Sequence, residues 1–335
     1  MRHGGDPTLA GQLYGISGRN WLDLSTGVNP WPWPHAADLA GKSRMDRFPG
    51  GQAIADLIAA AKTAYGASQA VATCALPGTE ILIHLMPFLI PGSTVLAETT
   101  YRSYDQAWRS AGGQLPVIRA DEIGDLDAAT SVLLVNPGNP DGKVFAKDVL
   151  MALVKSRTND AVVVVDEAYG EAEHGLSIVP DLAPDNPVLV LKSFGKFFGL
   201  PGLRLGFAFG NRRIVEQCAD LLGDWPISAP AVDIGTAALA DTAWQIDIRR
   251  RLAEQSAALD TALAAAGFNI VGGTRLFRLV ACDDAAGVHE GLARRGIWTR
   301  FFAEKPQWLR IGLPYDEQAM QKLASALAEI RKSAA

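Results

Sequence analysis

The chain has 335 residues, enough for a large core and more than one domain. Apolar residues make up 48% and charged residues 20% of the chain, the balance of a soluble globular protein. The net charge is −5 and no long basic run occurs, which argues against nucleic acid as a main partner.

Cysteine and hydropathy patterns narrow the class of protein further. Cys74, Cys218 and Cys282 are far apart, so we expect no disulfide framework, no metal site and a reducing cytoplasmic location. The first residues lack the apolar core of a signal peptide. The longest apolar stretch, 81–90, is too short to span a bilayer, so no membrane partner is expected.

The first two-thirds of the chain favour an α/β fold. Residues 1–40 are rich in Gly, Pro and Trp and are predicted to form an irregular arm. From about residue 50, helical and strand-like patterns alternate, and the strand-like run at 161–165 is apolar on both faces. This alternation predicts a three-layer, mostly parallel α/β domain. Helices are predicted at 52–65, 79–90, 102–112 and 147–157, and strands at 93–97, 131–135, 161–165, 188–192 and 205–209.

The pattern changes after about residue 230, where a smaller α+β domain is predicted. We therefore expect an arm over 1–40 that joins the small domain and the active site, a large domain over 41–230 and a small domain over 231–335. The elements expected there are a long helical stretch at 230–266, strands at 276–281 and 308–312, and helices at 285–295 and 316–332.

The segment with the clearest chemistry follows the strand predicted at 188–192. Ser193 ends the apolar run, Lys196 follows in a glycine-bearing turn, and Arg204 lies eight residues further on. A lysine that leaves a buried strand can act as a nucleophilic amine. The Ser193 hydroxyl and the Arg204 guanidinium could hold a phosphate beside it. These groups suit a Schiff-base enzyme that uses pyridoxal 5′-phosphate. Lys192 is a competing lysine, but the spacing to Ser193 and Arg204 favours Lys196.

Two further segments stand where α/β proteins place ligands. Gly78 and Thr79 precede a predicted helix, whose free N–H groups and dipole favour a phosphate, although such a segment is often only a helix cap. The run from Asn136 to Gly142 contains two Asn-Pro pairs and forms a rigid turn. In the functional interpretation Asn139 presents its amide to a ring hydroxyl; the alternative is a purely structural turn.

Asp166 ends the all-apolar strand predicted at 161–165, and Tyr169 follows three residues later. A carboxylate at such a place is costly to bury unless it has a cationic partner. A protonated pyridine nitrogen would be such a partner. A metal ligand or a helix cap are the alternatives for Asp166.

These segments occur together in one order and resemble the fold-type I pyridoxal phosphate enzymes, the aspartate aminotransferase superfamily. The resemblance implies that Lys196 links covalently to the cofactor and moves protons, and that Asp166 pairs with the ring nitrogen. It assigns the ring hydroxyl to Asn139 and Tyr169, and stacking on the ring to Tyr101, which could instead be a core aromatic. It further assigns the cofactor phosphate to Gly78, Thr79, Ser193 and Arg204, with Glu80 beside them.

Two C-terminal arginines suggest a substrate with two anionic ends. Arg310 lies in a segment similar to the family strand whose arginine binds the substrate carboxylate. Arg300 lies ten residues earlier, and the pair resembles that of histidinol-phosphate aminotransferases, where the second arginine helps to hold a phosphate. Either arginine could instead be a surface residue.

The N-terminal segments resemble threonine-phosphate decarboxylases of cobalamin biosynthesis. The shared features are His3-Gly-Gly and an Asp-x-Ser-x-x-x-Asn-Pro stretch that contains Asn29. The resemblance implies substrate-binding roles for His3 and Asn29, a homodimer, and decarboxylation of a phosphorylated amino acid. Close relatives carry a tyrosine that reaches the partner's cofactor phosphate; this chain has Phe48 there. A histidinol-phosphate-type aminotransferase and a non-catalytic scaffold are the competing functions.

Overall fold

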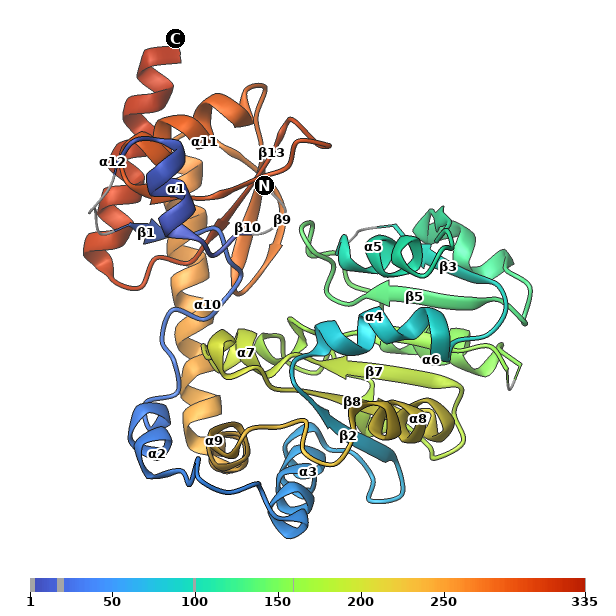
Figure 1. The fold of residues 1–335 in the computed structure, drawn as a ribbon. Coiled ribbons are helices and arrows are strands. Elements are labelled where there is room, and N and C mark those ends of the chain that lie inside the picture. Colours follow the sequence, from blue (N-terminus) through green and yellow to red (C-terminus); the bar gives the residue numbers. More distant parts are fainter. Residues whose placement is uncertain (1–3, 17–20, 99–100, 159, 335) are drawn as a thin grey trace. The chain divides into compact units, whose positions relative to one another are not determined.

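A computed structural model describes residues 4–16, 21–98, 101–158 and 160–334 (Figure 1). The chain forms two compact units: a larger one over Pro32–Ile246, and a smaller one that combines the residues up to Trp31 with those from Asp247 onward. These divisions differ from the domain boundaries expected near residues 40 and 230. The reason is that α9 (Ala229–Ala240) packs against both α2 (Ala36–Lys42) and α3 (Gly51–Tyr65), which places α2 and α9 in the larger unit.

A seven-stranded sheet organises the larger unit, in the strand order β2-β8-β7-β6-β5-β3-β4. Only β8 runs antiparallel to its neighbours, so the predicted mostly parallel sheet is confirmed. Its strands are β2 (Ala72–Leu76), β3 (Thr94–Ala97), β4 (Val117–Ile118), β5 (Ser131–Val135), β6 (Val163–Asp166), β7 (Val188–Lys192) and β8 (Gly206–Gly210).

Both faces of this sheet are covered. Val163 and Val164 are successive residues on opposite faces of β6, and both are fully buried. One face packs against α4, α5 and α8 in a single apolar core cluster, which includes Leu189 and Leu191 of β7 (Figure 1). The helices of the unit are α2, α3 (Gly51–Tyr65), α4 (Thr79–Leu89), α5 (Ser103–Ser110), α6 (Lys147–Lys155), α7 (Phe194–Phe197), α8 (Arg212–Leu222), α9 and the start of α10 (Thr242–Ala265).

Local sequence explains several helix ends. Gly66 follows α3 with φ of 70°, a left-handed conformation that costs glycine little. The Asn211 side chain accepts a hydrogen bond from the Ile214 amide and so caps the N-terminus of α8. The Ser228 side chain does the same for α9 by accepting from the Ala231 amide.

The smaller unit contains a four-stranded antiparallel sheet, in the order β12-β13-β10-β9. A separate parallel pair joins β1 to β11. Its elements are α1 (Pro7–Leu13), β1 (Leu22–Asp23), the rest of α10, β9 (Asn269–Thr274), β10 (Phe277–Ala281), α11 (Ala285–Arg294), β11 (Ile297–Trp298), β12 (Arg300–Phe301), β13 (Trp308–Gly312) and α12 (Glu317–Ala334). In the described part of the chain, no helix combines the length and apolar character needed to cross a membrane.

Candidate cofactor and substrate residues

The carboxyl ends of the parallel strands bring the predicted cofactor residues of the larger unit together. Asp166 is the last residue of β6, and the Asn136 amide, just past the end of β5, donates to the Asp166 carbonyl at 2.8 Å. Ser193 directly follows β7 and has extended backbone angles. In parallel sheets this edge is where ligands bind. The segments that the sequence singled out therefore converge on one edge of the sheet.

Asp166 is buried among neutral hydrogen-bond donors. Its Oδ1 accepts from the Ala168 amide at 3.1 Å, and its Oδ2 accepts from the Tyr104 hydroxyl at 3.0 Å. Burial raises the pKa of Asp166 to about 6, although both hydrogen bonds and the Lys196 charge act in the opposite direction. A buried carboxyl under this desolvation penalty favours a cation beside it. The position therefore fits a protonated ring nitrogen and excludes the helix-cap alternative, since Asp166 belongs to a strand.

Tyr104 is a site residue that sequence reasoning missed. Its side chain is fully buried in α5, within the core cluster, and only its hydroxyl reaches Asp166. A tyrosine at this helical position has the pattern of an ordinary core aromatic. Tyr101 lies before the start of α5, so helical spacing did not connect the two tyrosines either.

Removing the Tyr104 hydroxyl is expected to raise the pKa of Asp166 further above its usual value. The hydrogen bond stabilises the ionised carboxylate, by about 1 kcal/mol or more for a charged acceptor. In the cofactor-free protein, the free energy of unfolding falls as the pH rises through the pKa of Asp166. In Tyr104→Phe this fall should continue to a higher pH than in the wild type. Urea unfolding between pH 5 and pH 8 measures this. In an Asp166→Asn background the same change should not alter the pH dependence, and a persisting effect would contradict this role.

The structure distinguishes the two candidate lysines. Lys196 lies in the short helix α7, is partly exposed, and places its Nζ 5.8 Å from the centre of the Tyr169 ring. Lys192 is fully buried, and its Nζ lies 2.5 Å from the Glu167 carboxylate. A lysine held in a buried ion pair is not available as a nucleophile. The geometry therefore favours Lys196, as the spacing predicted.

The start of α4 forms a cradle with Arg204. Gly78 has φ of 84°, and a Cβ on it would collide with the Arg204 guanidinium, so the guanidinium lies directly over the glycine. Arg204 itself has a left-handed backbone, with φ of 56°. A Cβ on Gly206 would stand 3.0 Å from the Thr79 amide nitrogen. The N-terminus of a helix beside a guanidinium forms a site that fits a phosphate.

Tyr101 and Glu80 connect the starts of α4 and α5. Burial and then the Glu80 charge raise the pKa of Tyr101 well above its ordinary value, with a smaller contribution from Asp166. Tyr101 therefore lies near both carboxylates, and it also packs partly against the core cluster. Its position is compatible with stacking on a ring bound at Asp166.

The loop after β5 is closed by the Asn136 side chain. Its Oδ1 accepts from the Phe145 amide at 2.9 Å and its Nδ2 donates to the Phe145 carbonyl at 3.3 Å. The peptide bonds before Pro137 and Pro140 are both cis. Asn139 is partly exposed within this closed loop. Its assignment to a ring hydroxyl stays a prediction.

The smaller unit pairs the two predicted substrate arginines directly. Arg300 of β12 and Arg310 of β13 are cross-strand partners, and each is 7% exposed. The Arg310 Nη2 donates to the Ser25 carbonyl at 2.8 Å. Neither is the surface residue that the sequence left as an alternative. Asn29 is also buried and accepts a hydrogen bond from the Trp31 amide through its side chain, and His3 lies outside the described residues.

Known proteins of one family resemble the chain over nearly its full length. A curated threonine-phosphate decarboxylase from Sinorhizobium sp is 38% identical over 98% of each chain. Another from Pseudomonas aeruginosa is 36% identical over 100% of this chain and 99% of its own. The fold matches that of histidinol-phosphate aminotransferase from Sinorhizobium meliloti in complex with pyridoxal 5′-phosphate, with a TM-score of 0.84, 22% identity, and coverage of 98% and 95%.

These comparisons confirm the predicted resemblance and the predicted fold class. The family described as aminotransferase class I and II matches residues 19–327. With a family match across most of its length, the chain belongs to the class I and II aminotransferases.

Proposed function

We propose that the protein is a pyridoxal phosphate-dependent decarboxylase. It converts O-phospho-L-threonine to (R)-1-amino-2-propanol phosphate and CO₂, a step of cobalamin biosynthesis. The reaction is supported by the two decarboxylases that align with almost the entire chain. The observation that carries the substrate class is the buried pair Arg300 and Arg310, because two adjacent guanidinium groups suit a substrate with two anionic ends.

Different residues of the larger unit would bind different parts of the cofactor. When bound, pyridoxal phosphate supplies an electron sink for the bond that breaks at the substrate Cα. Asp166 would hold the ring nitrogen in its protonated form, and Tyr169 and Asn139 would orient the ring hydroxyl. Arg204, Ser193 and the amides at the start of α4 would bind the phosphate.

Lys196 would hold and move the proton in this reaction. Loss of CO₂ breaks the bond between Cα and the carboxylate carbon, and Cα must then receive one proton. The Lys196 Nζ stands beside the Tyr169 ring at the same sheet edge as Asp166 and can deliver that proton. Which bond at Cα breaks depends on its orientation, and contacts to the anionic groups of the substrate set that orientation.

Replacing either arginine by glutamine should weaken substrate binding. Loss of a charge-assisted hydrogen bond to a carboxylate or phosphate corresponds to about 10- to 100-fold in affinity. Steady-state kinetics with O-phospho-L-threonine should show this increase in KM for Arg300→Gln and for Arg310→Gln.

Arg278→Gln is the matched control, because Arg278 lies in the neighbouring strand β10 and pairs with Asp260. Its KM should stay near the wild-type value. An unchanged KM in both Arg300→Gln and Arg310→Gln would remove the support for a dianionic substrate.

A histidinol-phosphate-type aminotransferase is the second candidate, because a relative of that name is 32% identical over 75% of each chain. The two reactions differ in their need for a ketoacid. Purified protein should release CO₂ from O-phospho-L-threonine without any ketoacid, and should form no glutamate from histidinol phosphate and 2-oxoglutarate. Ketoacid-dependent glutamate formation, with no CO₂ release, would establish the aminotransferase. Neither product, together with no cofactor binding, would indicate a scaffold.

We also propose a cytoplasmic homodimer. The Phe48 and Trp225 rings stack 4.4 Å apart while both side chains stay largely exposed, an apolar surface that suits a second copy. The free cysteines suit a reducing compartment. Phe48 brings no hydroxyl to a partner's cofactor phosphate. Sedimentation of wild-type protein and of Phe48→Glu tests the dimer.

A further inference from the structure

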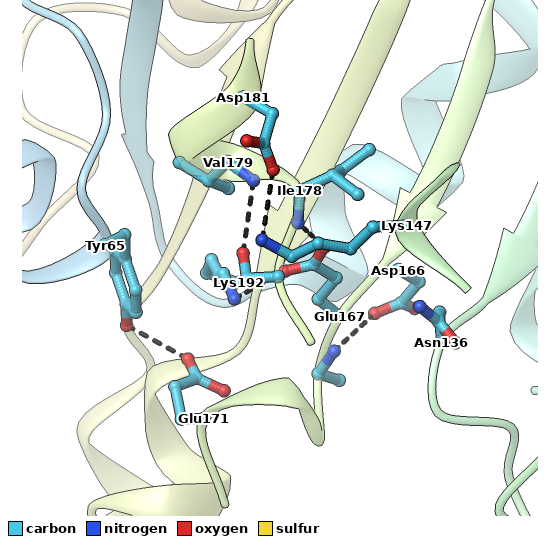
Figure 2. A network of polar contacts seen from close by, with 12 residues as sticks. Tyr65, Asn136, Lys147, Asp166, Glu167, Glu171, Ile178, Val179, Asp181 and Lys192 are labelled. Carbon is cyan, nitrogen blue, oxygen red and sulfur yellow. Dashed lines mark hydrogen bonds and ion pairs between the residues drawn. The ribbon is translucent and has the colours of Figure 1, made fainter. Parts of the chain in front are cut away.

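A second set of polar side chains is buried behind the cofactor edge of the larger unit (Figure 2). Side chains alternate along a strand, so residues that follow one another at the ends of β6 and β7 point to opposite faces of the sheet. Asp166 faces α5, where it meets Tyr104, and Glu167 therefore faces the other way. The polar set on that opposite side, here named the Lys192 cluster, consists of Lys192, Glu167, Glu171 and Tyr65.

Contacts within the Lys192 cluster join three segments of the chain. The Lys192 Nζ at the end of β7 lies 2.5 Å from the Glu167 Oε2, just past the end of β6. The other Glu167 oxygen accepts from the Ile178 amide at 2.9 Å. Glu171 accepts from the Tyr65 hydroxyl, at the end of α3, at 3.0 Å. The cluster thus fixes both ends of the turn between Glu167 and Glu171.

The charges of the cluster balance when one of its two carboxyl groups is protonated. Lys192 supplies one positive charge, whereas Glu167 and Glu171 could supply two negative charges, and all three are buried. Burial raises the pKa of Glu171 to about 7, with the Glu167 charge acting in the same direction and the Lys192 charge and Tyr65 hydroxyl opposing it. A largely neutral, hydrogen-bonded cluster is what a buried site tolerates.

The turn held by this cluster contains one predicted cofactor residue and directly follows another. Asp166 precedes Glu167, and Tyr169 lies between Glu167 and Glu171. In Figure 2 the Glu167 carboxylate lies at the Lys192 amine, whereas the Asp166 carboxylate lies beside Asn136. A Cβ on Gly170 would stand 3.2 Å from the Glu167 Cβ and 3.5 Å from the Lys192 Nζ, so the turn packs closely onto the cluster.

We propose that the Lys192 cluster positions Asp166, at the end of β6, and Tyr169, in the turn that follows. Lys192 is a positioning residue that acts through Glu167 and does not touch the cofactor. The proposal rests on the assignment of the cofactor to this edge under the proposed function. Residues that orient the ligands of metal ions contribute roughly 10- to 100-fold to affinity, and we expect an effect of this order on cofactor binding.

A set of variants separates positioning from general stability. Lys192→Met leaves Glu167 buried without its counter-charge, whereas Lys192→Met with Glu167→Gln removes both charges and keeps an acceptor for the Ile178 amide. Lys192→Arg keeps the positive charge. Arg157→Met is the matched control, because Arg157 is buried in the same unit and donates to the carbonyls of Leu126, Asp127 and Thr130.

The dissociation constant of pyridoxal phosphate and the urea midpoint of the cofactor-free protein are measured for each variant. Lys192→Met should lose at least about tenfold in cofactor affinity and should unfold at lower urea. The double variant should regain much of the urea midpoint but keep the weak affinity. Lys192→Arg should retain affinity, and Arg157→Met should lower the midpoint with unchanged affinity.

Three results would overturn the proposal: recovery of wild-type affinity in the double variant, an equal loss of affinity in Arg157→Met, or no loss in Lys192→Met. If the wild-type protein itself bound no pyridoxal phosphate, the proposed function would fail instead. Cofactor binding by the wild type therefore separates the two failures.

Discussion

Lys196→Ala is expected to lower kcat for O-phospho-L-threonine by at least roughly 10⁴-fold, because the variant lacks both the nucleophilic amine and the proton donor. Lys192 cannot replace it, since its amine is held in a buried ion pair with Glu167. The variant should still fold, because Lys196 is partly exposed and lies in a helix of four residues. Its far-UV circular dichroism should match that of the wild type.

Chemical reduction identifies the lysine independently of the reaction rate. Borohydride treatment of the wild-type protein makes the lysine–cofactor link permanent, and mass spectrometry of peptides should locate the added mass on Lys196. Lys147→Ala is a control for loss of a lysine charge, because Lys147 is partly exposed and pairs with Asp181 at 3.0 Å. Cofactor mass on Lys192, or near-normal turnover by Lys196→Ala, would contradict the assignment.

Asp166→Asn should nearly abolish turnover and yet stabilise the cofactor-free protein. The burial of Asp166 raises its pKa to about 6, above the ordinary value of 3.8 that applies in the unfolded chain. The ionised form is therefore disfavoured by folding. This cost is absent below the unfolded pKa, grows as the pH rises through the folded pKa, and reaches about 3 kcal/mol above it.

The asparagine variant removes this ionisation cost but loses about 1 kcal/mol of hydrogen bonding, because its amide group cannot accept from both donors. We expect it to be more stable than the wild type by about 2 kcal/mol near pH 8, with no gain near pH 4. Urea unfolding at both values of pH measures the difference. Its kcat should fall by roughly 10³-fold, because a neutral amide cannot hold a protonated ring nitrogen. If the variant and the wild type were equally stable at both pH values, or if the variant kept a near-normal kcat, Asp166 would not be the partner of the ring nitrogen.

Periodicity predicted most of the central sheet. The strands expected at 131–135 and 188–192 have those limits in the structure, and the helix expected at 52–65 begins one residue earlier. These segments are long and strongly apolar, so local pattern and burial agree. The strand β2 and the helix α8 were missed, because β2 is partly exposed at the edge of the sheet and α8 is rich in charged residues.

Candidate site residues could be proposed from the sequence where a motif contains them, but the sequence did not give contacts that depend on strand register. Asp166, Lys196 and Arg204 follow from the order of motifs along the chain. The Arg300–Arg310 pairing depends on the register of β12 against β13, which ten residues of separation do not determine. Glu167 lies between Asp166 and Tyr169, which the sequence singled out, yet its contact with Lys192 depends on the side-chain alternation at the end of β6 and on the pairing of β6 with β7.

The most direct test of the proposed reaction uses O-phospho-L-threonine labelled at its carboxyl carbon. The protein, loaded with pyridoxal phosphate and supplied with no ketoacid, should release labelled CO₂ over many turnovers. It should form one 1-amino-2-propanol phosphate for each CO₂. If the label stays in solution while the cofactor is converted to its pyridoxamine form, the protein is an aminotransferase and the proposed decarboxylation is wrong.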